Sequence, residues 1–261
     1  MRVVDSIVPA SASAEFLVVN DGTTFAGNLR SFIDRNVYLF GNYEEQLIEL
    51  FLSIVPPERR GIILDVGANV GTHSLRFARA FKRVHAFEPN PAVWAQFEKN
   101  VALNQLPNVM LHRVGLGDRG AQLPFYLTGK SNLGLGTFCH AEQYDTPLIE
   151  VGSASLVQGA DYLAAHGVSG VDAIKIDVQG FELEAIRGLL PVLERDRPCL
   201  WFELGPGTRQ VLKSKTALER LIPFRHEARI IEFRRTLLTH SVALAPAPAD
   251  LPAGDYIISP V

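Results

Sequence analysis

Residues 61–71 have the sequence Gly-Ile-Ile-Leu-Asp-Val-Gly-Ala-Asn-Val-Gly, and the prediction of the fold starts from them. The apolar run that ends at Asp65 is short and continuous, which is typical of a strand buried on both faces of a parallel sheet. Gly67 and Gly71 permit a tight turn and a close approach of the backbone to a ligand. Residues 72–81 have helical spacing, and Asn69 or Thr72 is the candidate N-cap. Strand, turn and helix together predict the first unit of a nucleotide-binding α/β sheet.

The spacing within this turn discriminates between ligands. A dinucleotide fingerprint is Gly-x-Gly-x-x-Gly and places a pyrophosphate on the helix N-terminus. Here Asp65 occupies the first position, and the pattern is Asp-x-Gly-x-x-x-Gly. A P-loop needs Gly-Lys before Ser or Thr, and the turn contains no lysine. A carboxylate at Asp65 would repel a phosphate but would suit a ligand that carries an ammonium group.

A second acid lies near the end of the next predicted strand, residues 84–89. Glu88 follows the glycine turn by about twenty residues, where folds of this type place the acceptor for a ribose diol. A ligand with a ribose, an amino-acid tail and no phosphate is S-adenosylmethionine, which is therefore the predicted cofactor. The alternative is an ordinary βαβ unit in which both acids are incidental.

The remainder of the chain alternates between strand and helix patterns. We predict further strands at 109–114, 172–178, 198–204, 229–233 and 255–258, with an antiparallel excursion at 121–127. Helices are predicted at 91–104, 159–166, 180–193 and 216–221, and loops at 115–118, 128–147 and 245–252. This order predicts a doubly wound, mostly parallel sheet with right-handed crossovers, whose ligands bind at the carboxyl ends of the strands.

The N-terminal region precedes this sheet. Residues 15–19 and the turn at 20–22 predict a hairpin, and residues 43–55 predict an amphipathic helix that ends at Pro56-Pro57. We interpret residues 1–56 as a cap or lid segment and residues 57–261 as the cofactor-binding domain.

Composition restricts the class of protein. The 261 residues carry a formal net charge of −3, which gives no reason to expect a nucleic-acid partner. Cys139 and Cys199 are the two cysteines, so a disulfide framework is not expected. No signal-peptide profile and no apolar run of membrane-spanning length occurs, so the expected location is the cytoplasm and no membrane span is expected.

Three motifs resemble those of the FkbM-type S-adenosylmethionine-dependent methyltransferases. They are Asp65–Gly71, Phe87–Pro89 and, most specifically, the segment Ile174–Glu182 with the sequence IKIDVQGFE. The likeness runs from about residue 43 to residue 203. It implies a Rossmann-like class I methyltransferase fold, a seven-stranded sheet with its last strand antiparallel, and O-methylation of a hydroxyl on a sugar, glycan or other natural product.

The chain departs from the family pattern at two places. Gln179 stands where the family usually has Glu, and Leu156-Val157 stands where it tends to have Leu-Asp. The cofactor motifs are intact, so both departures concern the substrate side.

An acid follows each of the five predicted parallel strands, and these acids supply most of the candidate site residues. Backbone at Gly67 and Gly71 would approach the methionine portion of the cofactor, and Asp65 would hold its ammonium directly or through water. Asn69, in the same turn, is also a candidate for cofactor binding. The further candidates for cofactor binding are Glu88 for the ribose, Asp118 for the adenine amino group, Asp177 beside the reacting centre, and Tyr43 with Glu44 as a cover. Helix capping is the structural alternative for the acids.

A hydroxyl nucleophile favours a general base. Asp177, at the end of the fourth parallel strand, is the first candidate for base or substrate orienter. Glu203 and His73 are further candidates, with Glu182 and His140 behind them. No metal is predicted, because Glu203-Leu204-Gly205 follows the fifth strand where a carboxylate pair would be needed.

Two other functions remain open at this point. The first is an NAD-dependent oxidoreductase or epimerase, which the missing middle glycine disfavours. The second is a non-catalytic protein that binds S-adenosylmethionine, which Gln179 and Val157 allow. The acceptor molecule and the oligomeric state are also open.

Overall fold

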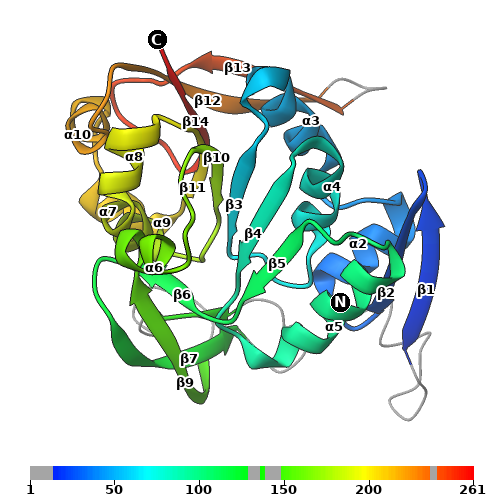
Figure 1. Ribbon diagram of the computed structural model, residues 1–261. Helices are drawn as coiled ribbons and strands as arrows, with labels where there is room; N and C mark the ends of the chain where they lie inside the picture. Colours follow the sequence, from blue (N-terminus) through cyan, green and yellow to red (C-terminus); the bar gives the residue numbers. More distant parts are fainter. Residues whose placement is uncertain (1–13, 129–135, 139–147, 236–239) are drawn as a thin grey trace.

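The computed structural model describes residues 14–128, 136–138, 148–235 and 240–261. Its central feature is an eight-stranded sheet with helices on both faces (Figure 1). In their order across the sheet, the strands are His240–Pro246 (β13), His226–Arg235 (β12), Gly254–Pro260 (β14), Cys199–Leu204 (β11), Val171–Ile176 (β10), Ile62–Val66 (β3), Arg83–Phe87 (β4) and Val109–His112 (β5). The five strands from β11 to β5 are parallel. Because β14 is antiparallel to both β11 and β12, β12 runs in the same direction as β11.

This topology confirms the predicted Rossmann-like, doubly wound sheet, with one addition. The structure adds an eighth strand, β13, which pairs with β12 at the edge of the sheet. Residues 245–246 belong to this strand, so the predicted loop at 245–252 begins later than expected. The prediction of a loop rested on the alanine-proline composition of this segment. That composition does not reveal that β12 supplies hydrogen-bond partners for the backbone of β13.

Helices cover both faces because neighbouring side chains of a buried strand point to opposite sides. Ile63 and Ala173 lie in one apolar core with the helices Glu45–Ile54 (α3) and Thr72–Ala80 (α4), and the helix Pro91–Leu103 (α5) packs beside them. Leu64 and Ile174 lie in the opposite core. The helices on that side are Gly159–Ala165 (α6), Glu182–Gly188 (α7), Leu190–Asp196 (α8), Pro206–Val211 (α9) and Lys215–Leu221 (α10).

The single helix predicted over residues 180–193 is wrong, because the structure has two helices there. α7 ends at Gly188, and α8 begins at Leu190 with Pro191 in its first turn. Proline has no backbone N–H and cannot continue the hydrogen bonds of a preceding helix, which accounts for the break.

A second, four-stranded sheet is inserted between β5 and α6. Its order is β6-β9-β7-β8, and its strands are Gly115–Gly117 (β6), Leu148–Gln158 (β9), Ala121–Thr128 (β7) and Gly136–Thr137 (β8). The antiparallel excursion at 121–127 is therefore confirmed. The loop predicted at 115–118 is wrong, since Gly115–Gly117 pairs with β9. Part of the loop predicted at 128–147 is likewise strand, since Thr128 ends β7 and Gly136–Thr137 form β8. Residues 129–135 and 139–147, including His140, lie outside the described residues.

The N-terminal segment packs on the main sheet and on α5 (blue in Figure 1). The predicted hairpin is formed by Glu15–Asn20 (β1) and Thr23–Asn28 (β2), and a helix that the sequence analysis missed, Phe32–Phe40 (α2), follows it. A short 3-10 helix, Pro57–Arg59 (η1), follows α3. Since α3 contributes Leu47, Ile48 and Phe51 to the core, this segment shares the core of the domain. Its role as a cap stays a prediction.

Among the described helices, none is long and apolar enough to cross a bilayer.

Candidate active site

A cavity of about 800 Å³ opens at the carboxyl ends of β3, β4 and β10. Of the predicted site residues, six line it: Tyr43, Gly67, Asn69, His73, Glu88 and Asp177. The predicted convergence of the glycine turn, Glu88 and Asp177 at one edge of the sheet therefore corresponds to a real concave site.

The glycine turn has the backbone conformation that its sequence requires. Gly67 and Gly71 have φ values of +83° and +92°, in the left-handed region that favours glycine. A Cβ at Gly67 would lie 1.8 Å from the carbonyl oxygen of Asp177, so the two strand ends touch here. Gly71 is itself the N-cap of α4 and no side chain caps that helix, so the predicted cap at Asn69 or Thr72 is wrong. The uncapped amides of α4 are consequently available to an anionic group of a ligand.

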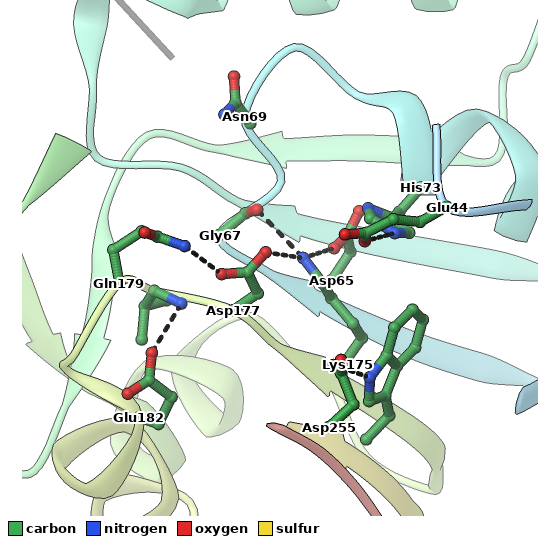
Figure 2. Close-up of polar contacts among 12 residues, drawn as sticks. Glu44, Asp65, Gly67, Asn69, His73, Lys175, Asp177, Gln179, Glu182 and Asp255 are labelled. Carbon is green, nitrogen blue, oxygen red and sulfur yellow. Dashed lines mark hydrogen bonds and ion pairs between the residues drawn. The ribbon is translucent and has the colours of Figure 1, made fainter. Parts of the chain in front are cut away.

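Lys175 joins the ends of β3 and β10. Its ammonium nitrogen lies 3.7 Å from Asp65 Oδ1, 3.6 Å from Asp177 Oδ2 and 3.4 Å from the carbonyl oxygen of Gly67 (Figure 2). Burial alone would lower the pKa of Lys175, but Asp177, Asp65 and Glu44 outweigh burial and raise it. Lys175 is therefore a permanent cation in this site. Besides pairing with these acids, its side chain lines the cavity.

Asp65 lies behind Lys175 and is fully buried. Its Oδ2 accepts a hydrogen bond of 2.5 Å from the Ser74 hydroxyl. Its Oδ1 has no hydrogen-bond partner among the described residues, and the Lys175 ammonium at 3.7 Å is the cation beside it. An unsatisfied buried carboxylate oxygen is costly, so this position favours a hydrogen-bond donor supplied by water or ligand.

Asp177 is held in one orientation by two neighbours. Its Oδ1 accepts a 2.8 Å hydrogen bond from Gln179 Nε2, and its Oδ2 faces Lys175. Burial would raise the pKa of Asp177, but Lys175 and the hydrogen bond from Gln179 outweigh burial and lower it. Asp177 is thus a carboxylate that faces the cavity and can accept a proton or a hydrogen bond.

Gln179 and Glu182 hold the loop that follows β10. Gln179 has a φ of +54°, and its carbonyl oxygen accepts a 2.8 Å hydrogen bond from the Thr137 hydroxyl in β8. Glu182 Oε1 accepts from the Gly180 N–H at 2.8 Å, and its Oε2 accepts from the Thr208 hydroxyl. Glu182 is buried and engaged by the backbone of its own loop, which is a structural role.

Glu88 is buried at the end of β4, on the opposite side of the glycine turn. Its two oxygens accept backbone N–H groups, from Asn69 at 2.9 Å and from Asn90 at 2.8 Å. Burial raises the pKa of Glu88 to about 7, against the opposing effect of these two hydrogen bonds. Each oxygen keeps a further acceptor position, which suits the pair of hydroxyls predicted to bind there.

His73 and Glu44 connect the N-terminal segment to α4. His73 Nε2 lies 3.2 Å from Glu44 Oε2, and the His73 ring packs against Tyr43 and Trp201. Burial, together with the charge of Glu44, raises the pKa of Tyr43, so its hydroxyl stays protonated. Tyr43 and His73 line this cavity, whereas Glu44 lines a second cavity.

Several predicted site residues lie outside the cavity lining. They are Glu44, Asp65, Gly71, Asp118 and Glu203. Asp118 is exposed just after β6. Glu203 is paired in register with Asp255 of β14, and burial together with Asp177 and Asp255 raises the pKa of Glu203 to about 8. Asp255 accepts a 2.8 Å hydrogen bond from Trp201 Nε1 and has its pKa raised by burial to about 6. The roles given to these residues stay predictions.

The second sheet supplies a wall that the sequence analysis missed. Phe125, Thr137 and Phe138 line the cavity, and Phe138 packs on Phe181 with ring centroids 5.5 Å apart. No motif marks these positions, because the contacts join segments that are far apart in the sequence. The alternation of Phe125 and Leu127 within a predicted strand is the one signal that a buried face existed there.

Among the described residues, no group of three or more His, Cys, Asp or Glu side chains could hold a metal ion. Cys199 is buried and forms no disulfide with any residue in the described part of the chain.

Comparisons with known proteins agree with the resemblance seen in the sequence. Residues 65–216, more than half of the chain, match the family described as "Methyltransferase FkbM domain". Methyltransferase 1 of Beauveria bassiana is 28% identical over 169 residues, which cover 56% of this chain and 66% of that protein. The hexuronic acid methyltransferase AglP of Haloferax volcanii is 26% identical, covering 58% of each chain. The 2-O-methyltransferase NoeI of Sinorhizobium fredii is also 26% identical, covering 52% of this chain and 60% of that protein. The chain thus spans from 58% to 66% of the length of these relatives.

Proposed function

The chain belongs to the methyltransferase FkbM family, and on that basis we propose that it transfers a methyl group from S-adenosylmethionine to a hydroxyl oxygen of a sugar or another natural product. The observation that carries the proposal is the set of polar groups around the cavity. Two carboxylates, Glu88 and Asp177, flank a glycine turn, and the helix that follows this turn has no side-chain cap. Two of the similar proteins carry names that describe sugar or O-methylation, which supports the acceptor class.

The residues of the cavity fit S-adenosylmethionine. Glu88 would accept the ribose hydroxyls, and the uncapped amides of α4 would receive the carboxylate of the amino-acid tail. The carbonyl of Gly67, which lines the cavity, would receive the ammonium, directly or through water, whereas Asp65 is covered by Lys175 and would act only through it. When bound, the cofactor supplies a methyl group on a positively charged sulfur.

The protein's own contribution is orientation and proton acceptance. Asp177 is ionised and fixed by Gln179 and Lys175, so it can orient the acceptor hydroxyl and take its proton as the oxygen forms its new bond. Holding the nucleophile in line is worth up to roughly 7–11 kcal/mol of the barrier. A positioned base adds about 10²–10⁴-fold. Asp177 is the residue to which we assign the second effect.

Calorimetric titration with S-adenosylhomocysteine and, in parallel, with NAD tests the cofactor. We expect micromolar binding of S-adenosylhomocysteine, its loss in Glu88→Ala, and no binding of NAD. Glu98→Ala is the matched control, because Glu98 is half-exposed on α5 and pairs only with Arg113. Binding of NAD in place of S-adenosylhomocysteine would refute the proposal.

Asp177→Asn tests the chemical step. With methyl-labelled S-adenosylmethionine and a panel of hydroxylated sugars, we expect at least a hundredfold loss of transfer while S-adenosylhomocysteine still binds. Unchanged transfer in this variant would remove Asp177 from the mechanism.

A further inference from the structure

A second cavity, open and about 930 Å³ in volume, lies where the β1–β2 turn, the α2–α3 connection, β12 and β13 meet. Phe233 lies near the end of β12 and is paired in register with Val242 of β13. Because β12 runs in the same direction as β11, this end of β12 belongs to the carboxyl edge of the sheet, where Asp177 and Glu203 also lie. The groove and the cofactor cavity are therefore on the same edge.

The two cavities share a wall. Tyr43 lines the cofactor cavity, and the next residue, Glu44, lines the groove. The Glu44 carboxylate lies 3.2 Å from His73, whose ring lines the cofactor cavity (Figure 2). A molecule bound in the groove would thus be separated from the cofactor cavity only by the wall that contains Tyr43 and Glu44.

The groove combines exposed aromatic rings with polar side chains. Phe40 at the end of α2 is 75% exposed and Phe233 is 69% exposed, which are the two highest values among the exposed aromatic residues described. Asp21, Asn42 and Glu44 surround them with carboxylate and amide groups. A pyranose ring has a C–H face that packs on an aromatic ring and hydroxyls at its rim that bond to amides and carboxylates. The lining therefore matches the surface of a sugar.

The charge of the groove restricts which sugars fit. Asp21, Glu44 and Glu45 contribute carboxylates, and among the described lining residues none is Lys, Arg or His. Arg76 compensates Glu45, and His73 faces Glu44 from the other cavity. Asp21 and Glu44 have no Lys or Arg ion-pair partner among the described residues, so an acidic chain would meet like charge here, while a neutral or amino-bearing chain would not.

We propose that this groove is the acceptor subsite for a neutral or amino-bearing oligosaccharide, with Phe40 and Phe233 as stacking platforms for the sugar units beyond the one that is methylated. The proposal rests on the proposed function and goes beyond it, because it names the part of the molecule that holds the acceptor and excludes uronic-acid chains.

The test uses the full chain on an array of oligosaccharides that contains neutral, amino-bearing and uronic-acid-bearing chains, with S-adenosylhomocysteine present. We expect neutral or amino-bearing chains to bind and the double variant Phe40→Ala/Phe233→Ala to lose at least tenfold in affinity for them. Phe32→Ala is the matched control, because Phe32 is an exposed aromatic residue of the same helix α2 and does not line the groove. This control should bind as the wild type does.

The affinity for S-adenosylhomocysteine separates this proposal from the proposed function. Neither Phe40 nor Phe233 lines the cofactor cavity, so that affinity should be unchanged in the double variant. Three results would refute the acceptor subsite while leaving the proposed function standing. They are no binding of any oligosaccharide, equal binding by the double variant, and preference for uronic-acid chains. A change of sedimentation in the double variant would also refute it, because the two rings would then form a contact between copies of the chain.

Discussion

At the scale of single residues, the pKa of Glu88 makes cofactor affinity depend on pH. Burial raises that pKa from 4.5 to about 7, so in the free protein the carboxylate forms only as the pH rises through neutrality. Two ribose hydroxyls need an ionised acceptor, so we expect affinity for S-adenosylhomocysteine to increase by roughly tenfold between about pH 6 and pH 8. Titration calorimetry across this range measures it. Glu88→Gln should bind weakly at every pH and show no such slope. An equally steep slope in that variant would assign the titration to another group.

The same shift has the opposite consequence for stability. The folded protein binds a proton at Glu88 more tightly than the unfolded chain, so this residue's contribution to stability is full below its ordinary pKa of 4.5. That contribution is lost as the pH rises through about 7. The site therefore gives up stability to keep a carboxylate where the ribose binds, as is common at functional positions.

Gly67 illustrates a residue whose side chain must be absent. Gly67→Ala would place a Cβ 1.8 Å from the Asp177 carbonyl oxygen and would keep a φ of +83°. We expect a loss of at least about 2 kcal/mol in the free energy of unfolding, because the clash with backbone adds to the conformational strain. Urea denaturation measures this loss. Gly167→Ala is the control, since Gly167 also has a positive φ of +67° but has nothing within 4 Å of the added Cβ. It should lose only about 1 kcal/mol, and equal losses would contradict the clash.

At the scale of elements, one asparagine ties the N-terminal hairpin to the glycine turn. Asn100 of α5 is buried, accepts from the Ala26 N–H of β2 at 2.8 Å and donates to the Val70 carbonyl at 3.1 Å. Asn100→Ala leaves both backbone groups unpaired, so we expect a loss of about 2–4 kcal/mol in unfolding free energy. Asn36→Ala is the control, because Asn36 bonds only within α2 at the surface. It should change stability by no more than about 0.5 kcal/mol. A small loss at Asn100 would mean that packing alone holds the hairpin.

The inserted sheet is the second element that shapes the site. Thr137 of β8 donates to the Gln179 carbonyl, and Gln179 in turn donates to Asp177. Through these two hydrogen bonds the inserted sheet is connected to the carboxylate that we assign as base. The presence of Gln179 instead of the usual family Glu is consistent with this arrangement, because an amide donates to Asp177 where a carboxylate would repel it.

At the scale of the whole molecule, a buried histidine pair between β4 and β5 predicts sensitivity to acid. His85 Nδ1 and His112 Nε2 are 2.9 Å apart, and His112 also stacks on Phe87. The groups that face His112 are His85 on β4, Tyr162 on α6 and His166, the C-cap residue of α6, with Arg83 close to His85. Burial, with His85 and His166, lowers the pKa of His112 to about 4. The folded protein resists protonation here, so the stabilising contribution of His112 is full above its ordinary pKa of 6.5 and is lost as the pH falls toward 4.

His112→Phe separates this effect from the carboxylates that titrate in the same range. At pH 7.5 the variant should be less stable than the wild type, because His85 loses its partner. At pH 5 we expect that deficit to shrink by about 1–2 kcal/mol, since the wild type must by then resist protonation and the variant has no imidazole at this position. Chemical denaturation at the two pH values gives the comparison. A deficit that is constant with pH would show that the histidine pair does not govern acid stability.

The sequence alone determined the sheet, the family and the acids at the strand ends. An apolar run, a glycine turn and a helical repeat are local patterns, and parallel strands bring their carboxyl ends to one edge whatever the intervening loops do. Asp65, Glu88 and Asp177 could therefore be assigned to one site before any contact was known.

Only the tertiary structure decided which of these acids line the cavity and what surrounds them. Asp65 is covered by Lys175, Asp118 is exposed, and Glu203 faces Asp255 instead of the cavity lining. The wall from the inserted sheet and the groove beside Glu44 join segments such as Thr137 with Gln179 and Phe40 with Phe233. Sequence periodicity reports which face of an element is buried, but it carries no information on which distant element covers that face. The burial of a site residue, the compensation of its charge and its access to the cavity all depend on which distant element covers it.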